Sequence, residues 1–123
     1  MSAHLRRAVL ALAVVVHLAV LYAPRVPSVG AAGVPGSDKL AHAGVFALVV
    51  AAAMWAGIPA RWVVPIALGH AVVSEVVQHL LLPARSGDVW DSVADVVGVG
   101  LGWALAKLVR RRRGGRRPSG PGR

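Results

Sequence analysis

Four long runs with almost no charge limit what this chain can fold into more than any other feature. They cover residues 8–23, 40–60, 62–84 and 89–106. Only Glu75 interrupts the third run, and only Asp91 and Asp95 interrupt the fourth. A helix that crosses a bilayer needs about 20 apolar residues. The sequence therefore predicts an all-α membrane protein, a four-transmembrane-helix bundle with spans at about 6–23, 39–57, 62–82 and 89–108.

The overall composition agrees with this prediction. Hydrophobic residues make up 56% of the chain, and the mean hydropathy is +0.63. Only 15% of the residues are charged, whereas an ordinary soluble domain has about 25%. The chain has no cysteine, which excludes a disulfide framework, a thiolate metal site and a thiol nucleophile. We expect one transmembrane domain over 1–109 and a basic, disordered cytoplasmic tail over 110–123.

The distribution of basic residues predicts the orientation of the spans. Of the 14 Lys and Arg residues, all but Arg25, Lys39 and Arg85 precede span 1, lie between spans 2 and 3, or follow span 4. Cytoplasmic segments carry the excess of Lys and Arg, so both termini are expected in the cytoplasm of a multi-pass cell-membrane protein. Aromatic residues near the predicted span ends fit the two interfaces: Tyr22, Trp55, Trp62, Trp90 and Trp103.

Two other interpretations of the chain ends compete with this one. Arg6 and Arg7 before an apolar run would also suit a cleaved signal peptide, but no small-x-small cleavage site follows closely. The basic tail would suit nucleic acid. It has no interleaved aromatic residues and directly follows a span. We therefore expect no nucleic-acid partner, and we interpret the tail as a topology signal that contacts anionic lipid.

The chain has only five acidic residues, and the four-span arrangement puts all of them near the outer surface of the membrane. At 1.5 Å per helical residue they lie within roughly 10 Å of that surface. Three basic residues share this level, and His42 and Gln78 lie one helical turn from acidic residues. The outer ends of spans 2, 3 and 4 are therefore predicted to form one polar cluster: Asp38, Lys39, His42, Glu75, Gln78, Arg85, Asp91 and Asp95.

Helix capping explains some of these residues equally well. Asp88 follows Ser-Gly as an N-cap residue would, Asp91 suits the positive end of the helix dipole, and Asp38 suits a helix start. Capping does not explain Glu75, which lies toward the C-terminal end of its span, or Asp95, which lies past the first turn. Acidic groups inside a membrane are usually paired or functional. The alternative interpretation of Glu75 and Asp95 is an internal ion pair with Lys39 or Arg85 that only fixes helix packing.

The fourth span carries its aspartates on the same helical face as Gly98 and Gly102. Small residues at this spacing let transmembrane helices approach closely, so this face is predicted to point into the bundle. The aspartates would then face protein and an outward-opening polar pocket. His17 and His70, near the middle of their runs, are interpreted as interhelical hydrogen-bonding residues rather than ligands.

Three segments resemble the signature segments of the VanZ-like family, and the resemblance covers about residues 5–108. They are DKLAHAGVF (38–46), SEVVQHLLLPAR (74–85) and DSVADVVGVGLG (91–102). The family pattern D-K-x-x-H-x-x-x-F, E-x-x-Q, a loop Arg and D-x-x-x-N-x-x-G is matched by Asp38, Lys39, His42, Phe46, Glu75, Gln78, Arg85, Asp91 and Gly98. Asp95 stands where the family typically has Asn. The resemblance implies a small polytopic bacterial membrane protein, and the namesake is associated with low-level resistance to the glycopeptide teicoplanin.

Three kinds of function fit the cluster. The first is a membrane-embedded enzyme of the outer leaflet that acts on a lipid-linked or cell-wall intermediate. Glu75 would then be the acid or base, and Lys39 and Arg85 would hold an anionic group. His42 would be a proton carrier oriented by Asp38. The second is a non-catalytic protein that binds such an intermediate, an antibiotic or a partner. The third is a transport or proton-relay role. His42, Glu75 and Asp91 could also supply metal ligands, although no motif such as H-E-x-x-H is present.

Overall fold

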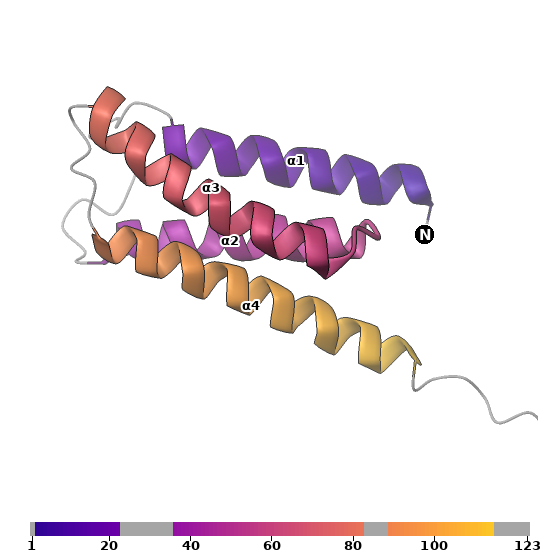
Figure 1. Ribbon diagram of the computed structural model, residues 1–123. Helices are drawn as coiled ribbons and strands as arrows, with labels where there is room; N and C mark the ends of the chain where they lie inside the picture. Colours follow the sequence, from indigo (N-terminus) through magenta and orange to yellow (C-terminus); the bar gives the residue numbers. More distant parts are fainter. Residues whose placement is uncertain (1, 23–35, 83–88, 115–123) are drawn as a thin grey trace, which may run out of the picture.

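The computed structural model describes residues 2–22, 36–82 and 89–114, and every regular element in these ranges is an α-helix. The helices are α1 (Ala3–Tyr22), α2 (Ser37–Trp55), α3 (Ala60–Leu81) and α4 (Val89–Gly114) (Figure 1). Each is long and apolar enough to cross a membrane. The prediction of an all-helical chain with four apolar spans is confirmed, and the fold fits a multi-pass membrane protein.

Successive helices run in opposite directions, so the helix bundle has two distinct ends. The start of α1, the α2–α3 connection and the end of α4 lie at one end of the bundle, and the other helix ends lie opposite (Figure 1). The four acidic residues of the described ranges all lie in the second group: Asp38, Glu75, Asp91 and Asp95. We call this the acidic end. The opposite, basic end carries Arg6, Arg7, Arg61, Lys107, Arg110, Arg111 and Arg112.

The helix α2 is central and packs against the three others, most extensively against α4. Two glycines make this close contact possible. A Cβ atom on Gly102 would lie 2.5 Å from the carbonyl oxygen of Ala47, and one on Gly98 would lie 2.9 Å from Cβ of Phe46. Because backbone atoms of α2 occupy this space, a larger residue would force the helices apart. The predicted inward face of α4 is confirmed: Asp91, Asp95, Gly98 and Gly102 are all buried.

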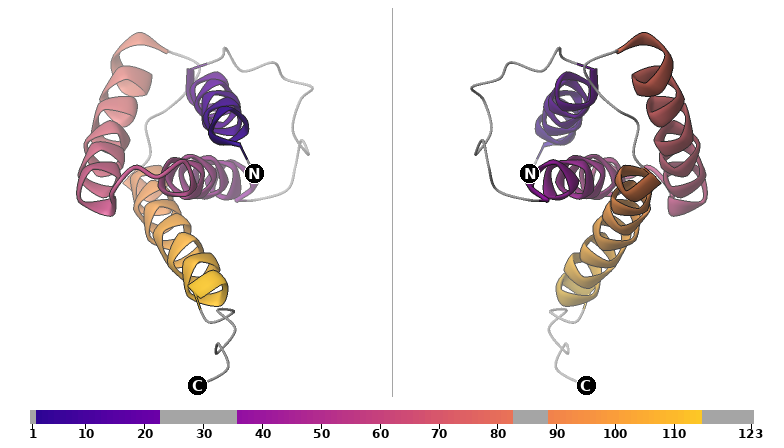
Figure 2. Two further views of the ribbon diagram at one scale, coloured as in Figure 1. Left: turned by 90° about the vertical axis from the view of Figure 1, so that its right-hand side faces the viewer. Right: turned by 90° about the vertical axis from the view of Figure 1, so that its left-hand side faces the viewer.

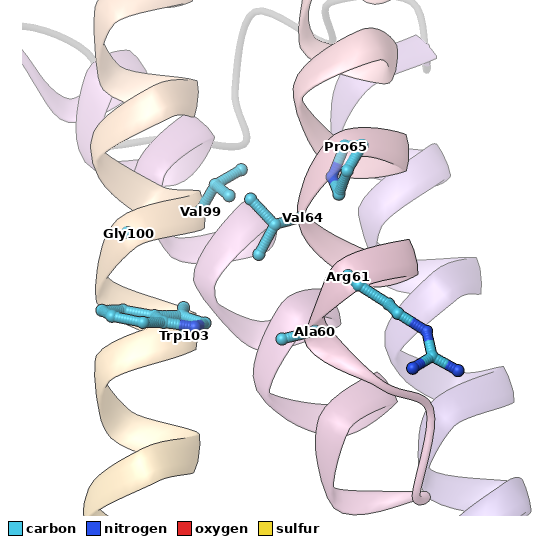
Figure 3. A pocket seen from close by; sticks show the side chains of 7 residues that line it. All are labelled: Ala60, Arg61, Val64, Pro65, Val99, Gly100 and Trp103. Carbon is cyan, nitrogen blue, oxygen red and sulfur yellow. The ribbon is translucent and has the colours of Figure 1, made fainter.

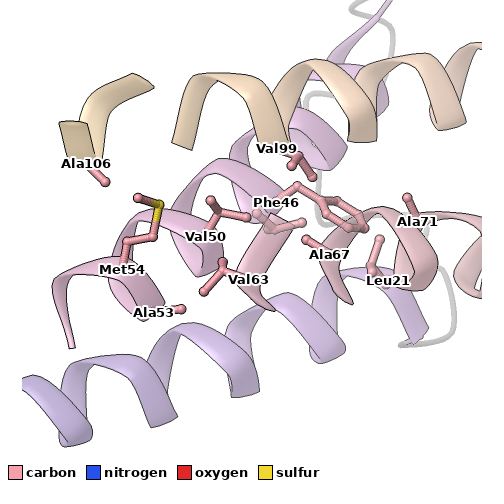
Figure 4. Close-up of a cluster of buried hydrophobic side chains, with 11 residues drawn as sticks. Leu21, Phe46, Val50, Ala53, Met54, Val63, Ala67, Ala71, Val99 and Ala106 are labelled. Carbon is pink, nitrogen blue, oxygen red and sulfur yellow. The ribbon is translucent and has the colours of Figure 1, made fainter. Parts of the chain in front are cut away.

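A small apolar core joins all four helices on the inner side of the bundle (Figure 4). Phe46 and Leu21 are fully buried in it, and Val50 and Met54 continue it toward the basic end. The other contributing residues are small: Val45, Ala53, Val63, Ala67, Ala71, Val99 and Ala106. Close helix packing through small side chains is the usual means of association between helices in a bilayer.

The outward surface of the helices is also apolar. Large side chains from all four helices are more than half exposed: Leu12, Leu40, Ile66, Val72 and Leu101. In water, exposed apolar area costs about 25 cal/mol per Å², whereas lipid tails provide an apolar surrounding. The structure thus has a surface for lipid around a core of small residues.

The α2–α3 connection is a tight turn. The backbone of Gly57 has φ +102°, which side chains disfavour, and its N–H donates to the Met54 carbonyl at 3.2 Å. Pro59 follows in an extended conformation, and its carbonyl accepts from Trp62 and Val63 at the start of α3. A glycine after one helix and a proline before the next end and begin helices in this way.

The C-terminal part of α4 differs from expectation. The sequence predicts a span ending near 108 and a disordered tail from 110, but α4 continues to Gly114. Basic side chains are favoured at the negative C-terminal end of a helix dipole, and this segment carries several arginines. Arg110 also donates to the carbonyl of Met54 at 2.7 Å and so caps the end of α2. In Figure 2 this part of α4 leads away from α1 and α3. Residues 115–123 lie outside the described ranges.

Candidate functional site

Lys39 joins the first turns of α2 and α4 at the acidic end. Its Nζ lies 3.2 Å from Oδ2 of Asp38 and 3.4 Å from Oδ1 of Asp91. The side chains of Lys39 and Asp38 are about one third exposed, whereas that of Asp91 is only 7% exposed. The lysine is therefore held between two carboxylates from different helices, at the edge of the site.

One turn deeper, His42 and Asp95 form a buried pair between the same two helices. Nδ1 of His42 lies 2.9 Å from Oδ1 of Asp95, and the aspartate side chain is fully buried. With the carboxylate oxygen of Asp95 as acceptor, Nδ1 of His42 is the donor of this hydrogen bond. From the sequence we expected Asp38 to orient His42. That expectation was wrong, because Asp95 on the neighbouring helix occupies this position.

The same pairing shows what the carboxylate of Asp95 contacts inside the bundle. Its Oδ1 accepts from His42, and its Oδ2 is buried with no hydrogen-bond partner among the described residues. The alternative of an ion pair between Asp95 and Lys39 is not what the structure has. A carboxylate that holds an imidazole in a fixed tautomer is a common arrangement in sites that move protons.

Helix capping explains only part of the placement of Asp38 and Asp91, the two carboxylates that contact Lys39. Asp38 is the second residue of α2 and Asp91 the third of α4, both in first turns where the helix dipole favours a negative charge. Asp91 is nevertheless buried and bound to Lys39, so it also joins two helices. Asp95 lies beyond the first turn, where the dipole has little influence. The α2–α4 contact explains its burial.

Gln78 does not belong to the contacts between α2 and α4. Its side-chain amide donates to the main-chain carbonyl of Leu21 at 2.9 Å and is 2% exposed. It therefore ties α3 to the end of α1. Four residues earlier, the hydroxyl of Ser74 donates to the carbonyl of Ala71 in its own helix. Both side chains satisfy backbone groups, which is a structural role.

Glu75 lies on α3, one turn before Gln78. The residue is half-buried, and both carboxylate oxygens are buried within the structure. Its assignment to the working site stays a prediction. Arg25, Arg85 and Asp88 lie outside the described ranges.

The described ranges do not bring together a set of metal ligands. No group of three or more His, Asp or Glu side chains within them is arranged to hold a metal ion. The set considered from sequence, His42, Glu75 and Asp91, does not form such a group. His42 instead uses one ring nitrogen for Asp95.

A second polar group, which was not predicted as a unit from the sequence, lies between α1 and α3. Nε2 of His17 is 3.0 Å from Nδ1 of His70, and Nε2 of His70 is 3.0 Å from the hydroxyl of Tyr22. The prediction that the two histidines bond between helices is confirmed. Tyr22 was interpreted only as an interface aromatic. No local spacing in the sequence indicates its bond to His70, which lies 48 positions away.

The ring of Phe46 contacts this group from α2. Its centroid lies 4.5 Å from that of His17 and 6.0 Å from that of His70. Phe46 is one turn further along α2 than His42, so a fully buried apolar ring follows the His42–Asp95 pair. Beyond it, the described core toward the basic end consists of apolar side chains. Among the described residues, the buried polar side chains thus concentrate in the acidic half of the bundle.

The chain gives no match in comparisons with protein-family models, with curated proteins or with solved structures. The site is therefore interpreted from its own chemistry. It offers a lysine between two carboxylates at the edge and an imidazole fixed by a buried carboxylate one turn below. Such a set can exchange a proton or hold a polar group that approaches from the acidic end.

Proposed function

We propose that this chain is a VanZ-like multi-pass protein of the cell membrane whose acidic end faces outward and works on a lipid-linked or cell-wall intermediate. The family assignment rests on the three sequence segments described above. Two of them, 38–46 and 91–102, meet in the α2–α4 contact. The observation that carries the proposal is the buried His42–Asp95 pair, at 2.9 Å, directly below the Lys39 ion pairs.

In this proposal His42 is the residue that accepts and returns a proton, and Asp95 is the residue that positions it. Asp95 replaces the family's usual Asn, which could accept the same hydrogen bond without a charge. The carboxylate holds the imidazole of His42 in one orientation between the two helices. Lys39, together with Arg85 in the predicted cluster, would attract an anionic group such as a phosphate.

A transport role is less well supported. Intramembrane histidines and carboxylates mark proton relays in many transporters, and the Tyr22–His70–His17 chain has suitable groups. Between the hydrogen bonds of Tyr22, His70 and His17 and the basic end, however, the described core consists of apolar side chains. A non-catalytic binding role uses the same outward site and is separated from catalysis by the variants below.

The orientation can be tested directly because the chain has no cysteine. We would introduce Ser37→Cys at the acidic end and Ile58→Cys in the α2–α3 turn, and treat intact cells with a membrane-impermeant maleimide. We expect Ser37→Cys to react in intact cells and Ile58→Cys to react only after permeabilisation. The reverse pattern would refute the outward placement of the acidic end.

The function itself is tested by drug susceptibility. Wild type, His42→Gln, Asp95→Asn, Glu75→Gln and Arg85→Ala would be expressed at matched membrane levels in a sensitive bacterium, and teicoplanin would be titrated. His4→Gln, an exposed histidine at the opposite end, is the matched control. We expect wild type and His4→Gln to protect and His42→Gln to fail. No protection by wild type would refute the link to glycopeptide resistance.

The same variants separate catalysis from binding. Loss of protection in Glu75→Gln and His42→Gln, with folded protein at normal levels, indicates proton transfer. Retained protection in both, with loss in Arg85→Ala, indicates a binding site for an anionic group. Asp95→Asn is expected to retain partial protection, because the amide oxygen can still accept from Nδ1 of His42.

A further inference from the structure

The basic end contains a cavity between α1, α2 and α4, away from the proposed working site. Its volume is about 460 Å³, within the range of roughly 300–1,000 Å³ that is usual for small-molecule sites. The walls are mainly apolar, and two arginines from different helices line it. The main lining residues are Arg6 and Val9 of α1, Leu48 and Ala51 of α2, and Leu105 and Arg110 of α4.

A second cavity at the same end provides a useful contrast. It lies between α3 and α4, has a volume of about 480 Å³ and is lined by Val64, Val99 and Trp103 among others. Arg61 borders it, but Figure 3 shows this side chain leading away from α4. The α3–α4 cavity is therefore an apolar groove without a charged group directed into it. Only lipid tails or apolar side chains would be favoured there.

The two arginines of the first cavity have donors to offer. Nε of Arg6 is buried and has no hydrogen-bond partner among the described residues. Arg110 donates one N–H to the Met54 carbonyl, and a guanidinium has five N–H donors. No acidic residue of the described ranges lies at this end. Arg6 is half-buried and Arg110 is exposed, so an anion that reaches both guanidinium groups would give the buried Nε of Arg6 the partner that a polar atom away from water requires.

The ligand that suits such a cavity carries an anionic oxygen group and a long apolar part. Arginine is the preferred partner of phosphate because its planar fork makes two parallel hydrogen bonds. Apolar walls at a membrane interface suit an acyl chain. We propose that this cavity binds one anionic phospholipid, with its phosphate between Arg6 and Arg110 and part of one acyl chain against Val9, Leu48 and Leu105. This inference does not depend on the function proposed for the acidic end.

Neighbouring arginines on α1 provide a matched test. Arg6 lines the cavity, whereas Arg7 is exposed and outside it. The protein and the Arg6→Gln and Arg7→Gln variants would be placed in phosphatidylcholine vesicles. Acyl-chain spin-labelled phosphatidylglycerol and phosphatidylcholine then report the relative association constant for the anionic lipid. Both variants lose one charge from the same surface, so general attraction of anionic lipid is equal in the two.

We expect Arg6→Gln to lower the preference for phosphatidylglycerol about tenfold and Arg7→Gln to lower it by about twofold at most. A charge-assisted hydrogen bond in a cavity contributes more than a charge screened by solvent. Equal losses in the two variants would show surface attraction only and would overturn the proposal. So would a wild type that prefers neither lipid.

A second pair of variants tests the acyl-chain part and does not depend on Arg6. Ala51→Leu would fill the cavity, and Ala41→Leu adds the same volume at an exposed position of α2 outside it. We expect Ala51→Leu to reduce the fraction of motionally restricted phosphatidylglycerol, while Ala41→Leu leaves it unchanged. If Ala51→Leu retains the wild-type fraction, the cavity does not hold the chain, and the proposal fails.

Discussion

The two ends of this bundle use charged residues in different ways. At the acidic end, charged and polar side chains of α2 bond to those of α4, and Asp95 and Asp91 are buried between the helices. At the basic end, Arg110 donates to a main-chain carbonyl and Lys107 lies over the ring of Trp103 in its own helix, 4.2 Å from its centroid. Ion pairs and hydrogen bonds between side chains thus join the helices at the acidic end. At the basic end the charged groups contact a main-chain carbonyl, an aromatic ring or the surroundings.

This difference has an energetic consequence. A buried polar group that loses its partner keeps the full cost of desolvation, whereas an exposed one regains water. The acidic end should therefore respond strongly to single substitutions and the basic end weakly. Substitutions at both ends test this contrast, from the largest expected change in the free energy of unfolding to the smallest.

The largest effect is expected from His42→Ala. The substitution leaves the fully buried carboxyl of Asp95 without its partner, and we expect the protein to lose about 2–4 kcal/mol of stability. The free energy of unfolding would be measured by circular dichroism in mixed micelles. His4→Ala, at an exposed position, should change it by less than about 0.5 kcal/mol. Equal effects from the two would contradict the importance of the buried pair.

The next effect tests the close approach of α2 and α4. Gly98→Ala would place a methyl group against Ala43 and Phe46, and overpacking of this kind costs about 1–3 kcal/mol. A Cβ atom on Gly100, two residues away, would have nothing within 4 Å, so Gly100→Ala is the control and should not destabilise. A harmless Gly98→Ala would mean that the helices are less closely packed than in the structure.

The acidic half also shows which features can be predicted from sequence. Apolar runs predicted the four helices, because a bilayer sets their length. The spacing of Asp91, Asp95, Gly98 and Gly102 predicted the inward face of α4, since residues three and four apart share a helix face. Both inferences concern one helix at a time.

Features that depend on how two helices meet were harder to predict. The partner of His42 depends on the rotation of α2 against α4, so Asp95 replaced the expected Asp38. The Tyr22–His70–His17 chain joins residues about fifty positions apart, and no local spacing indicates such a contact. The extension of α4 to Gly114 is accompanied by a contact between Arg110 and the end of α2. Apolar patterning carries no information on these pairings.

A smaller effect is expected within the Tyr22–His70–His17 chain. Tyr22→Phe removes the hydroxyl that bonds to His70 at 3.0 Å, and we expect a loss of about 1 kcal/mol. Tyr22 is the only tyrosine, so the Raman signal of its phenol can be assigned in the wild-type protein. His70→Ala should shift that signal toward an unbonded phenol. An unchanged signal would show that the two side chains do not interact.

The smallest effect is expected at the basic end. Arg110→Gln removes a charged donor from the carbonyl of Met54, which lies at the negative end of the α2 dipole. Such an interaction contributes about 0.3–1 kcal/mol and weakens with salt. Measured in a zwitterionic detergent without anionic lipid, Arg110→Gln should therefore lower stability slightly, and less so at high salt. Arg111→Gln, the exposed neighbour, is the control. If Arg110→Gln cost as much as His42→Ala, the two ends would not differ in the way that their contacts indicate, and the basic end would be as dependent on its charges as the acidic end.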